Sequence, residues 1–289
     1  MKIRVILAGA AAAAVMCAAL PTVSAEETEI TDYVAFTAIK STIGQGFTVE
    51  PLLVPIYEGD TGLDVVERAA DIQSVDSDYG AYIIGFADTD TGADVPEEIA
   101  AVCHEMSGRN TEGYLSSADY TAESGWSYFL NGEYAQVGIS DYVPHAGDVL
   151  EFRFTVYGYG ADLGVDNSSW GGASALVDAV DASDLIWLCT LADEAVKQSD
   201  AYVNAMAVLS EFGASQEEID NAAALLMEES VMALEEIEDT QTDADTQQAA
   251  DTDASDTGKG SPDTGVEGLA VVFGAVVIAG GALCLAKKK

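Results

Sequence analysis

The sequence predicts an α+β protein in which a strand-rich domain precedes a bundle of helices. Three observations predict this class. Apolar and polar residues alternate over residues 149–157, as in a strand with one buried face. The pair Asn131-Gly132 stands between two strand-like runs, as in a hairpin turn. Further along the chain, apolar residues recur at helical spacing. We therefore expect one domain over residues 26–170 and a helical bundle over residues 173–237.

Short apolar runs and turn residues mark the elements of the first domain. Asn-Gly readily takes the two positive φ angles of a type I′ turn, so residues 126–130 and 133–137 should pair as a hairpin. In the strand at 149–157, we expect the face with Phe152 to be buried and the face with Glu151 to meet water. The other expected elements are strands at 34–39, 52–57 and 81–86, a helix after the turn at 58–61, and a helix at 97–106 opened by Pro96.

The second domain is predicted to be a small three-helix bundle. Gly213 should end its second helix, and Ser215 with Glu218 forms a capping box for the third. Residues 215–226 resemble the end of FIVAR-type helical modules of Gram-positive surface proteins, which implies a stalk that spaces the first domain from the cell wall. The three apolar stripes are Leu185, Leu188, Ala192 and Val196; Tyr202, Met206, Leu209 and Phe212; and Ile219, Ala223, Leu226, Leu234 and Ile237.

The N-terminus has the pattern of a secretory signal peptide. Lys2 and Arg4 precede an apolar run over residues 5–20, and small residues lead to a cleavage site after Ala25. Acylation at Cys17 is the alternative, but the preceding methionine is larger than lipoprotein processing prefers. We expect residues 1–25 to direct export.

The C-terminus predicts a membrane-spanning helix followed by a cytosolic anchor. An uncharged apolar run over residues 268–286 is long enough to cross the hydrocarbon core, and the expected transmembrane segment is 266–286. Three lysines end the chain and should stay in the cytosol. Before this helix lies the pentapeptide Ser261, Pro262, Asp263, Thr264 and Gly265.

Motif, apolar span and basic tail together resemble a sortase cell-wall sorting signal over residues 261–289. Ser261 stands where the common L-P-x-T-G motif has leucine, as in the S/P-P-x-T-G variant of some clostridial sortases. The resemblance implies that a sortase thiolate attacks the carbonyl of Thr264 and breaks the Thr264–Gly265 bond. A peptidoglycan amine then attacks the acyl-enzyme and becomes joined to Thr264. A permanent single-span membrane anchor is the alternative.

The charge balance excludes unaided nucleic-acid binding. The chain has 50 acidic and 11 basic residues, a formal net charge of −39, so a polyanion would be repelled. Removal of both ends takes away more bases than acids, which makes the mature surface more acidic still. Residues 238–260 are acidic and lack large apolar side chains, and we expect them to form a disordered linker.

The sequence predicts neither a metal site nor an enzyme. Cys103 and Cys189 could bridge, although two small buried thiols fit their spacing better. The run Asp88 to Asp94 alternates carboxylates like a calcium loop, but glycine and alanine occupy two positions that an EF-hand fills differently. Two histidines and no nucleophile motif leave no catalytic constellation.

The first domain also resembles the transcobalamin-like C-terminal domain of exported Firmicutes proteins, over roughly residues 30–165. Gly59-Asp60-Thr61 and Gly80-Ala81-Tyr82-Ile83 fit the early part of that family. The later motifs are Asp119-Tyr120-Thr121, Ser124-Gly125-Trp126-Ser127-Tyr128, Asn131-Gly132, Val137-Gly138, Tyr142, Gly147-Asp148-Val149 and Gly158-Tyr159-Gly160-Ala161-Asp162-Leu163-Gly164.

This resemblance implies a β-grasp-like fold, in which a small mixed sheet wraps a helix, and a soluble ligand such as a corrinoid. The family is similar to the cobalamin-contacting domain of vertebrate vitamin B12 carriers, which clasps its ligand against a separate α-helical barrel. No such barrel accompanies the domain in this sequence, and half a clasp buries less of a ligand.

The candidate ligand-binding residues lie around the predicted hairpin. Trp126 and Tyr128 share one strand face, where aromatic residues serve as core or as a ligand platform. Asn131, Tyr134 and Tyr142 belong to turns, and we expect both tyrosines to be exposed contacts. Two functions remain: a cell-wall-anchored protein that binds a small ligand, and an adhesin or display protein that binds host or cell-surface macromolecules. An aromatic-lined cavity near Trp126 and Tyr142 would favour the small ligand.

The sorting signal can be tested by replacing Thr264 with alanine. Without the threonine whose carbonyl the sortase attacks, the chain should leave the muramidase-solubilised wall fraction and appear in membrane or medium. Cell fractionation with antibody detection measures this. A variant that stays in the wall as firmly as the native chain would contradict the sortase interpretation.

Overall fold

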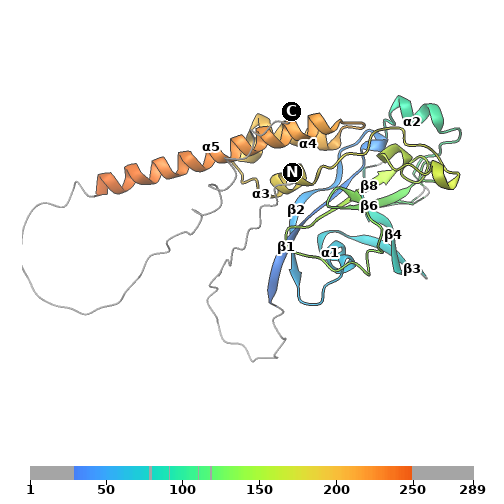
Figure 1. The fold of residues 1–289 in the computed structure, drawn as a ribbon, viewed down its shortest axis with the longest axis horizontal. Helices are drawn as coiled ribbons and strands as arrows, with labels where there is room; N and C mark the ends of the chain where they lie inside the picture. The colour runs from blue at the N-terminus through green and yellow to red at the C-terminus, as the bar shows by residue number, and fades with distance from the viewer. Residues whose placement is uncertain (1–28, 78–79, 91, 110, 118, 249–289) are drawn as a thin grey trace, which may run out of the picture.

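The computed structural model describes residues 29–77, 80–90, 92–109, 111–117 and 119–248. The predicted signal peptide, the sorting motif and the predicted transmembrane segment lie outside these residues. Within the part that is described, no helix is long and apolar enough to cross a membrane. The fold is mixed α and β, as the sequence predicts (Figure 1).

Within the described residues, eight strands form two sheets. The larger sheet has the order β2-β1-β8-β6-β7, from β1 (Ile30–Ile39), β2 (Phe47–Tyr57), β6 (Gly125–Leu130), β7 (Glu133–Tyr134) and β8 (Val149–Thr155). Only β1 and β8 pair in parallel; the other neighbours are antiparallel. The smaller sheet has the order β3-β4-β5, from β3 (Ile72–Ser77), β4 (Gly80–Ala87) and β5 (Tyr114–Ser116).

An aromatic core fills the space between the two sheets. Phe86 of β4 lies at its centre, with ring centroids 6.3 Å from Phe36, 4.7 Å from Trp126 and 5.2 Å from Phe152. Such tilted and edge-on ring contacts add to the burial of apolar area. Helix α1 (Gly62–Ala69) contributes Val65 and its neighbours to this core, and helix α2 (Glu97–Val102) contributes one isoleucine.

The second face of the larger sheet is covered, and here the prediction of a solvated face for β8 is wrong. Glu151 and Thr155 are buried, and Arg153 is nearly so. Helix α3 (Ser183–Leu191) packs on this face, so Ala35 and Val149 join the apolar core of the helices. Alternation reports which residues share a face, but a distant segment decides whether that face meets water.

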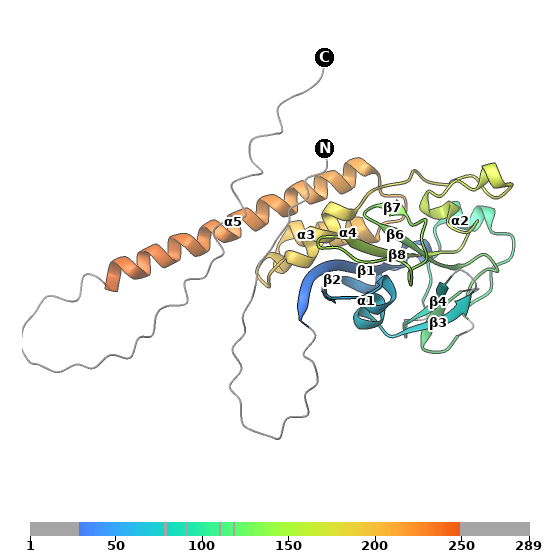
Figure 2. The same ribbon diagram turned by 60° about the horizontal axis from the view of Figure 1, so that its bottom comes forward.

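The helical part contains the three predicted helices, α3, α4 (Asp200–Ser210) and α5 (Gln216–Gln248). They pack on one another around Leu185, Leu209 and Leu226. The predicted capping box begins α5. The Glu218 backbone N–H donates to the Ser215 hydroxyl, and the Ser215 backbone N–H donates to the Glu218 carboxylate. Figures 1 and 2 show α5 projecting well beyond the body.

Helix α5 corrects part of the predicted disordered linker. The helix continues to Gln248, although we expected residues 238–260 to be disordered. The lack of large apolar residues argued against a core there, but alanine, glutamate and glutamine also favour helix, and a helix already formed is extended at little cost. The rest of that linker lies outside the described residues.

Three further local differences concern the length and number of elements. The Asn131-Gly132 turn has the predicted positive φ angles of 51° and 79°, but β7 is shorter than predicted. Helix α2 ends at Val102 rather than at residue 106, because the backbone adopts an extended conformation at Cys103. Strand β3 was not predicted, since most of its residues are polar and exposed. Both cysteines of the described part, Cys103 and Cys189, are free.

Candidate functional site

Trp126 belongs to the aromatic core and not to a ligand platform. Its side chain is 5% exposed, and its ring contacts Phe86 and Phe154 at centroid distances of 4.7 and 5.2 Å. The indole Nε1–H donates to the carbonyl oxygen of Leu115 at 2.9 Å. The indole is thus packed and its one polar group is satisfied, so no ligand reaches it in this structure.

The structure brings two of the other three aromatic candidates, Tyr128 and Tyr142, together. The hydroxyl of Tyr128 donates to the carbonyl of Val137. Burial, followed by the nearby Asp141 and Tyr134, raises the pKa of Tyr128 to about 12. Burial and a hydrogen bond to a carboxylate also raise the pKa of Tyr142, and Tyr128 adds to that shift. Tyr128 and Tyr142 therefore lie together in the core beside the loop 135–148, whereas Tyr134 pairs with Phe129, whose side chain lies on the other face of β6.

The exposure of these tyrosines was predicted only in part. Tyr134 is 40% exposed, as expected for a turn residue, and its ring meets Phe129 edge-on. Tyr142 was also expected to be an exposed contact, and this expectation is wrong, because its side chain is only 7% exposed. The loop around Tyr142 folds back on the domain, so a turn residue becomes a core residue.

Asp148 holds this loop in place. Its carboxylate accepts hydrogen bonds from the hydroxyl of Tyr142, from Asn131 Nδ2 at 2.8 Å and from the backbone N–H of His145 at 2.8 Å. Asn131 Oδ1 in turn accepts from the backbone N–H of Val149 at 2.9 Å. Asn131 therefore fixes the hairpin turn. The sequence places Asp148 in a turn, but nothing in its spacing shows that it joins three segments.

The same loop covers the start of helix α1. The backbone N–H groups of Gly62 and Leu63 donate to the carbonyls of Tyr142 and Ile139, at 2.7 and 3.1 Å. A Cβ atom at Gly62 would lie 2.7 Å from the side chain of Ile139, so only glycine allows this approach. The loop is thus joined to α1 and to the hairpin at once.

The outer side of this loop is the part that a ligand could reach. We call it the turn surface and define it by Tyr134, Val137, Val143 and His145. Val143 is 59% exposed, and the other three side chains are exposed as well. The apolar side chains of the turn surface belong to a loop whose backbone is hydrogen-bonded to Asp148 and to α1. Exposed apolar groups on an ordered loop are typical of a contact surface.

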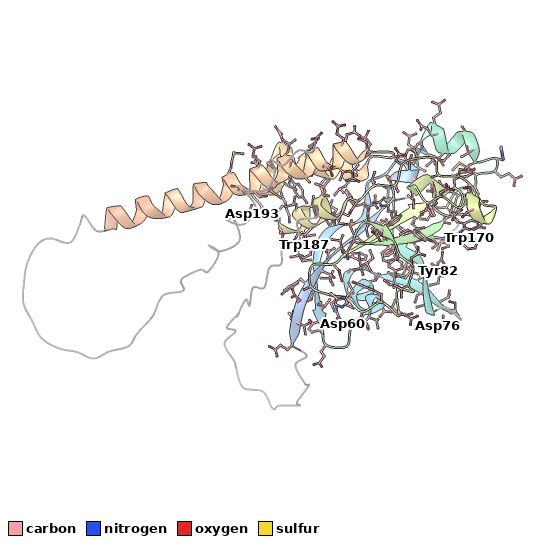
Figure 3. All side chains as sticks on the ribbon, viewed as in Figure 1. Asp60, Asp76, Tyr82, Trp170, Trp187 and Asp193 are labelled. Carbon is pink, nitrogen blue, oxygen red and sulfur yellow. The ribbon has the colours of Figure 1, made fainter. Side chains whose placement is uncertain are left out.

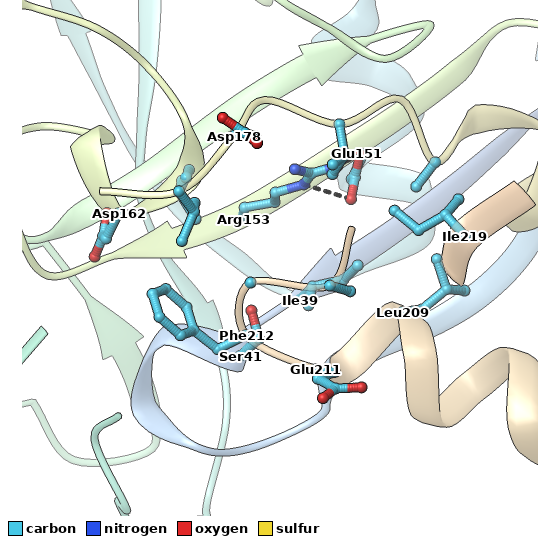
Figure 4. Close-up of a pocket in the computed structure, with 16 residues that line it drawn as sticks. Ile39, Ser41, Glu151, Arg153, Asp162, Asp178, Leu209, Glu211, Phe212 and Ile219 are labelled. Atoms are coloured by element: carbon cyan, nitrogen blue, oxygen red, sulfur yellow. Dashed lines mark hydrogen bonds and ion pairs between the residues drawn. The ribbon is translucent and has the colours of Figure 1, made fainter. Parts of the chain in front are cut away.

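A pocket lies on the opposite face of the larger sheet, away from the predicted residues. Figure 4 shows it between β8 and the turn from α4 to α5. Its cavity volume is only about 50 Å³, far below the range for drug-sized molecules and much too small for a corrinoid. Glu151 and Arg153 lie on its floor, paired at 2.6 and 2.7 Å, and Asp178 and Glu211 lie at its rim.

Asp162 is the other buried carboxyl group of this region. It accepts hydrogen bonds from the hydroxyl of Thr155 and from the backbone N–H groups of Val156 and Tyr157, at 2.8 and 3.1 Å. Burial raises the pKa of Asp162 to about 6, although these hydrogen bonds act in the opposite direction. Asp162 therefore organises the chain directly after β8.

The run that suggested a calcium loop is instead an ion-pair cluster. Asp88 lies 2.7 Å from Lys40 Nζ and 3.5 Å from Arg109 Nη1, and all three side chains are buried. Burial raises the pKa of Asp88, but hydrogen bonds from Lys40 and Thr48 lower it by more in total. The pKa of Asp88 is therefore below its usual value. Two cations thus occupy the position that calcium would need. Across the described ranges, no group of three or more candidate ligands could hold a metal ion.

The comparisons with known proteins match part of the chain. Residues 110–156 match the profile of a family described as Domain of unknown function (DUF4430). This segment includes β6, β7, the loop 135–148 and β8. No curated protein matches the sequence.

Two solved structures are similar over less than half of this chain. Haptocorrin in complex with Cbi is 20% identical with a TM-score of 0.28, over 47% of this chain and 28% of that one. A candidate metal-binding protein from Ruminococcus gnavus ATCC 29149 is 12% identical with a TM-score of 0.23, over 43% of this chain and 96% of that one. The chain thus spans under a third of the haptocorrin chain.

Replacing Asp148 with alanine should loosen the turn surface. Three donors lose a charged acceptor, and the hydroxyl of Tyr142 is left buried, so the free energy of unfolding should fall by about 3 kcal/mol. Urea denaturation measures this change. The matched control is Asp141→Ala on the same loop, which should change stability by less than about 0.5 kcal/mol. Equal stability of the two variants would contradict the role of Asp148.

The buried carboxyl of Asp162 should make stability depend on pH. Its pKa rises from 3.8 to about 6 on folding, so its contribution is complete below about pH 4 and is lost as the pH rises through 6. Between pH 5 and 7, the native chain should lose about 1 kcal/mol relative to Asp162→Asn, which cannot ionise. Urea denaturation across this range, above the sequence pI of about 4.1, measures the difference. A difference that does not change with pH would exclude Asp162 as the cause.

Proposed function

We propose that the protein is an exported, cell-wall-anchored surface protein that binds a small soluble ligand on its turn surface. A corrinoid is the ligand class that the sequence resemblance implies. The signal peptide and the sorting motif of residues 261–265 support export and anchoring, with sortase and peptidoglycan as partners. The β-grasp-like fold is supported by the parallel pairing of β1 and β8. These are the strands of the larger sheet that come first and last in the sequence, and α1 lies between them in the chain.

The observation that carries this proposal is the exposed apolar loop beside the buried tyrosines Tyr128 and Tyr142. These two candidate residues lie together in the core, although fourteen positions of the chain separate them. Tyr134 and Val143 are exposed at the surface. Exposed aromatic and aliphatic groups of this kind suit the face of a planar ligand.

The geometry also limits how tightly a ligand can bind. The turn surface contacts a ligand from one side only, and the packing of Trp126 and Tyr142 removes the cavity that would bury it. Because this surface buries only one side of a ligand, we expect affinity in the micromolar range, about −8 kcal/mol. A role as an enzyme is not part of this proposal, because no candidate residue here combines a nucleophile with a base.

A surface that recognises macromolecules is the second candidate function. The observation that favours it is the packing of Trp126 and Tyr142, which leaves an open surface in place of an aromatic-lined cavity. Open surfaces with a few exposed aromatic groups are typical of protein contacts. An adhesin or display protein would use the same anchor and the same helical stalk.

Calorimetric titration with cyanocobalamin and cobinamide tests the proposed function. The full-length chain should bind at least one of them with a micromolar Kd. A Tyr134→Ala, Val143→Ala double variant should weaken binding about tenfold or more, because it removes two of the three exposed apolar side chains of the turn surface. The matched control is Tyr82→Ala, which removes an exposed tyrosine from β4.

Circular dichroism should show that the double variant and the Tyr82→Ala control both keep the native fold. Absence of heat from either corrinoid at millimolar concentration would reject the corrinoid and favour recognition of macromolecules. Binding that the Tyr134 and Val143 changes leave intact would place the site elsewhere on the chain.

A further inference from the structure

A second exposed surface carries two of the most open aromatic side chains of the described residues. Tyr159 is 65% exposed and Trp170 is 90% exposed. Figure 3 shows Trp170 at the end of the body away from the projecting part of α5. We call residues 157–172 the aromatic loop; it includes the short turns η2 (Ala161–Leu163) and η3 (Ser168–Trp170). A tryptophan this exposed is unusual on a protein surface, and tryptophan and tyrosine are enriched where partners bind.

Hydrogen bonds hold both aromatic residues on one ordered backbone. Asn167 Nδ2 donates to the carbonyl of Gly158 at 2.9 Å, and the Asn167 carbonyl accepts from the N–H groups of Trp170 and Gly172, both at 3.0 Å. Asn167 therefore links the backbone beside Tyr159 to that of Trp170. Tyr159 itself has a φ of 52°, a left-handed conformation that a non-glycine residue keeps only where its surroundings impose it.

The charges around the aromatic loop are negative. The backbone N–H of Gly158 donates to Glu123 Oε2 at 2.8 Å, and that of Ser168 donates to Asp166 Oδ1 at 2.8 Å. Hydrogen bonds from Ser168 lower the pKa of Asp166, which stays ionised at neutral pH. Between Arg153 and Lys197 the sequence contains no lysine or arginine.

The basic side chains of the described residues do not offset this negative field, because each has an acidic partner. The chain as a whole has 50 acidic and 11 basic residues. The field therefore attracts cations and repels anions over the surface. The pairs are Lys40 with Asp88, Arg68 with Asp60, Arg109 with Asp88, Arg153 with Glu151, and Lys197 with Glu194.

We propose that the aromatic loop binds a lysine- or arginine-rich segment of a partner protein. A cation placed over the faces of Trp170 and Tyr159 is attracted by the ring quadrupoles, with tryptophan the stronger partner. Asp166 and Glu123 add negative charge beside the rings, and the field of the whole chain steers a basic segment toward them. This surface is separate from the turn surface, so the inference does not depend on the proposed function.

Binding of hexalysine to the full-length chain tests this inference by calorimetry at low ionic strength. We expect binding that weakens as salt rises, and none to hexaglutamate. Each ring should contribute a factor of about two to five in affinity, so Trp170→Ala and the Trp170→Ala, Tyr159→Ala double variant should bind progressively more weakly. Trp170→Phe should keep most of the affinity, because it keeps a ring.

All of these variants have the same net charge as the native chain, which separates ring contacts from unspecific attraction. Tyr33→Ala, at a partly exposed tyrosine of β1, is the matched control and should bind like the native chain. Hexalysine binding of equal strength in the double variant would overturn the inference, and so would the absence of hexalysine binding at low salt. Circular dichroism confirms that the variants are folded.

Discussion

The parallel pairing of β1 with β8 is the constraint on which the rest of the structure depends. It aligns Ala35 with Val149 and Ile39 with Arg153. A parallel pair cannot be closed by a tight turn, so the chain between the two strands forms the other sheet and both helices of the β-rich part. The pairing also holds the turn surface, because Ala35 N–H donates to the Asp148 carbonyl at 2.9 Å and Gly147 N–H to the Tyr33 carbonyl at 3.0 Å.

The two faces of this strand pair are buried by different means. On one face, Phe36 and Phe152 join the aromatic core, where burial of apolar area supplies the stabilisation. On the other face, Glu151 and Arg153 are covered by the helical part and neutralise one another through two hydrogen bonds. Buried ion pairs offset their own desolvation at best, so this pair neutralises the charges that the helical part buries and adds little stability. The pocket of Figure 4 lies where this polar face meets the helices.

Both candidate surfaces flank strand β8. The loop 135–148 leads into the strand and is held by Asp148, while the aromatic loop 157–172 leaves it and is held by Asp162 and Asn167. In each case, a carboxylate that accepts several hydrogen bonds orders a loop. Because the loop is already ordered, it loses less conformational entropy when a ligand binds. The two surfaces differ in character, because the turn surface presents mainly aliphatic groups and tyrosine, whereas the aromatic loop combines open rings with unopposed negative charge.

Local chemistry was readable from the sequence, because its causes lie within a few residues. The Asn131-Gly132 turn and the capping box at Ser215 depend on neighbouring residues alone, and the structure contains both. The sequence also placed the candidate tyrosines around one hairpin. The prediction of disorder after residue 237 failed because it weighed only the missing apolar surface and not the helix that precedes it.

Only the tertiary structure decided which side chains a ligand can reach. Trp126 faces Phe86 from another sheet, and Tyr142 is buried because its loop packs on α1. The second face of β8 is covered by helix α3, which begins 28 residues after the strand ends. Asp148 and Asn167 act through partners on separate turns, which no spacing reports. Burial and hydrogen-bond partners of this kind are set by contacts between distant segments, whereas turns and caps are set by backbone conformation within one segment.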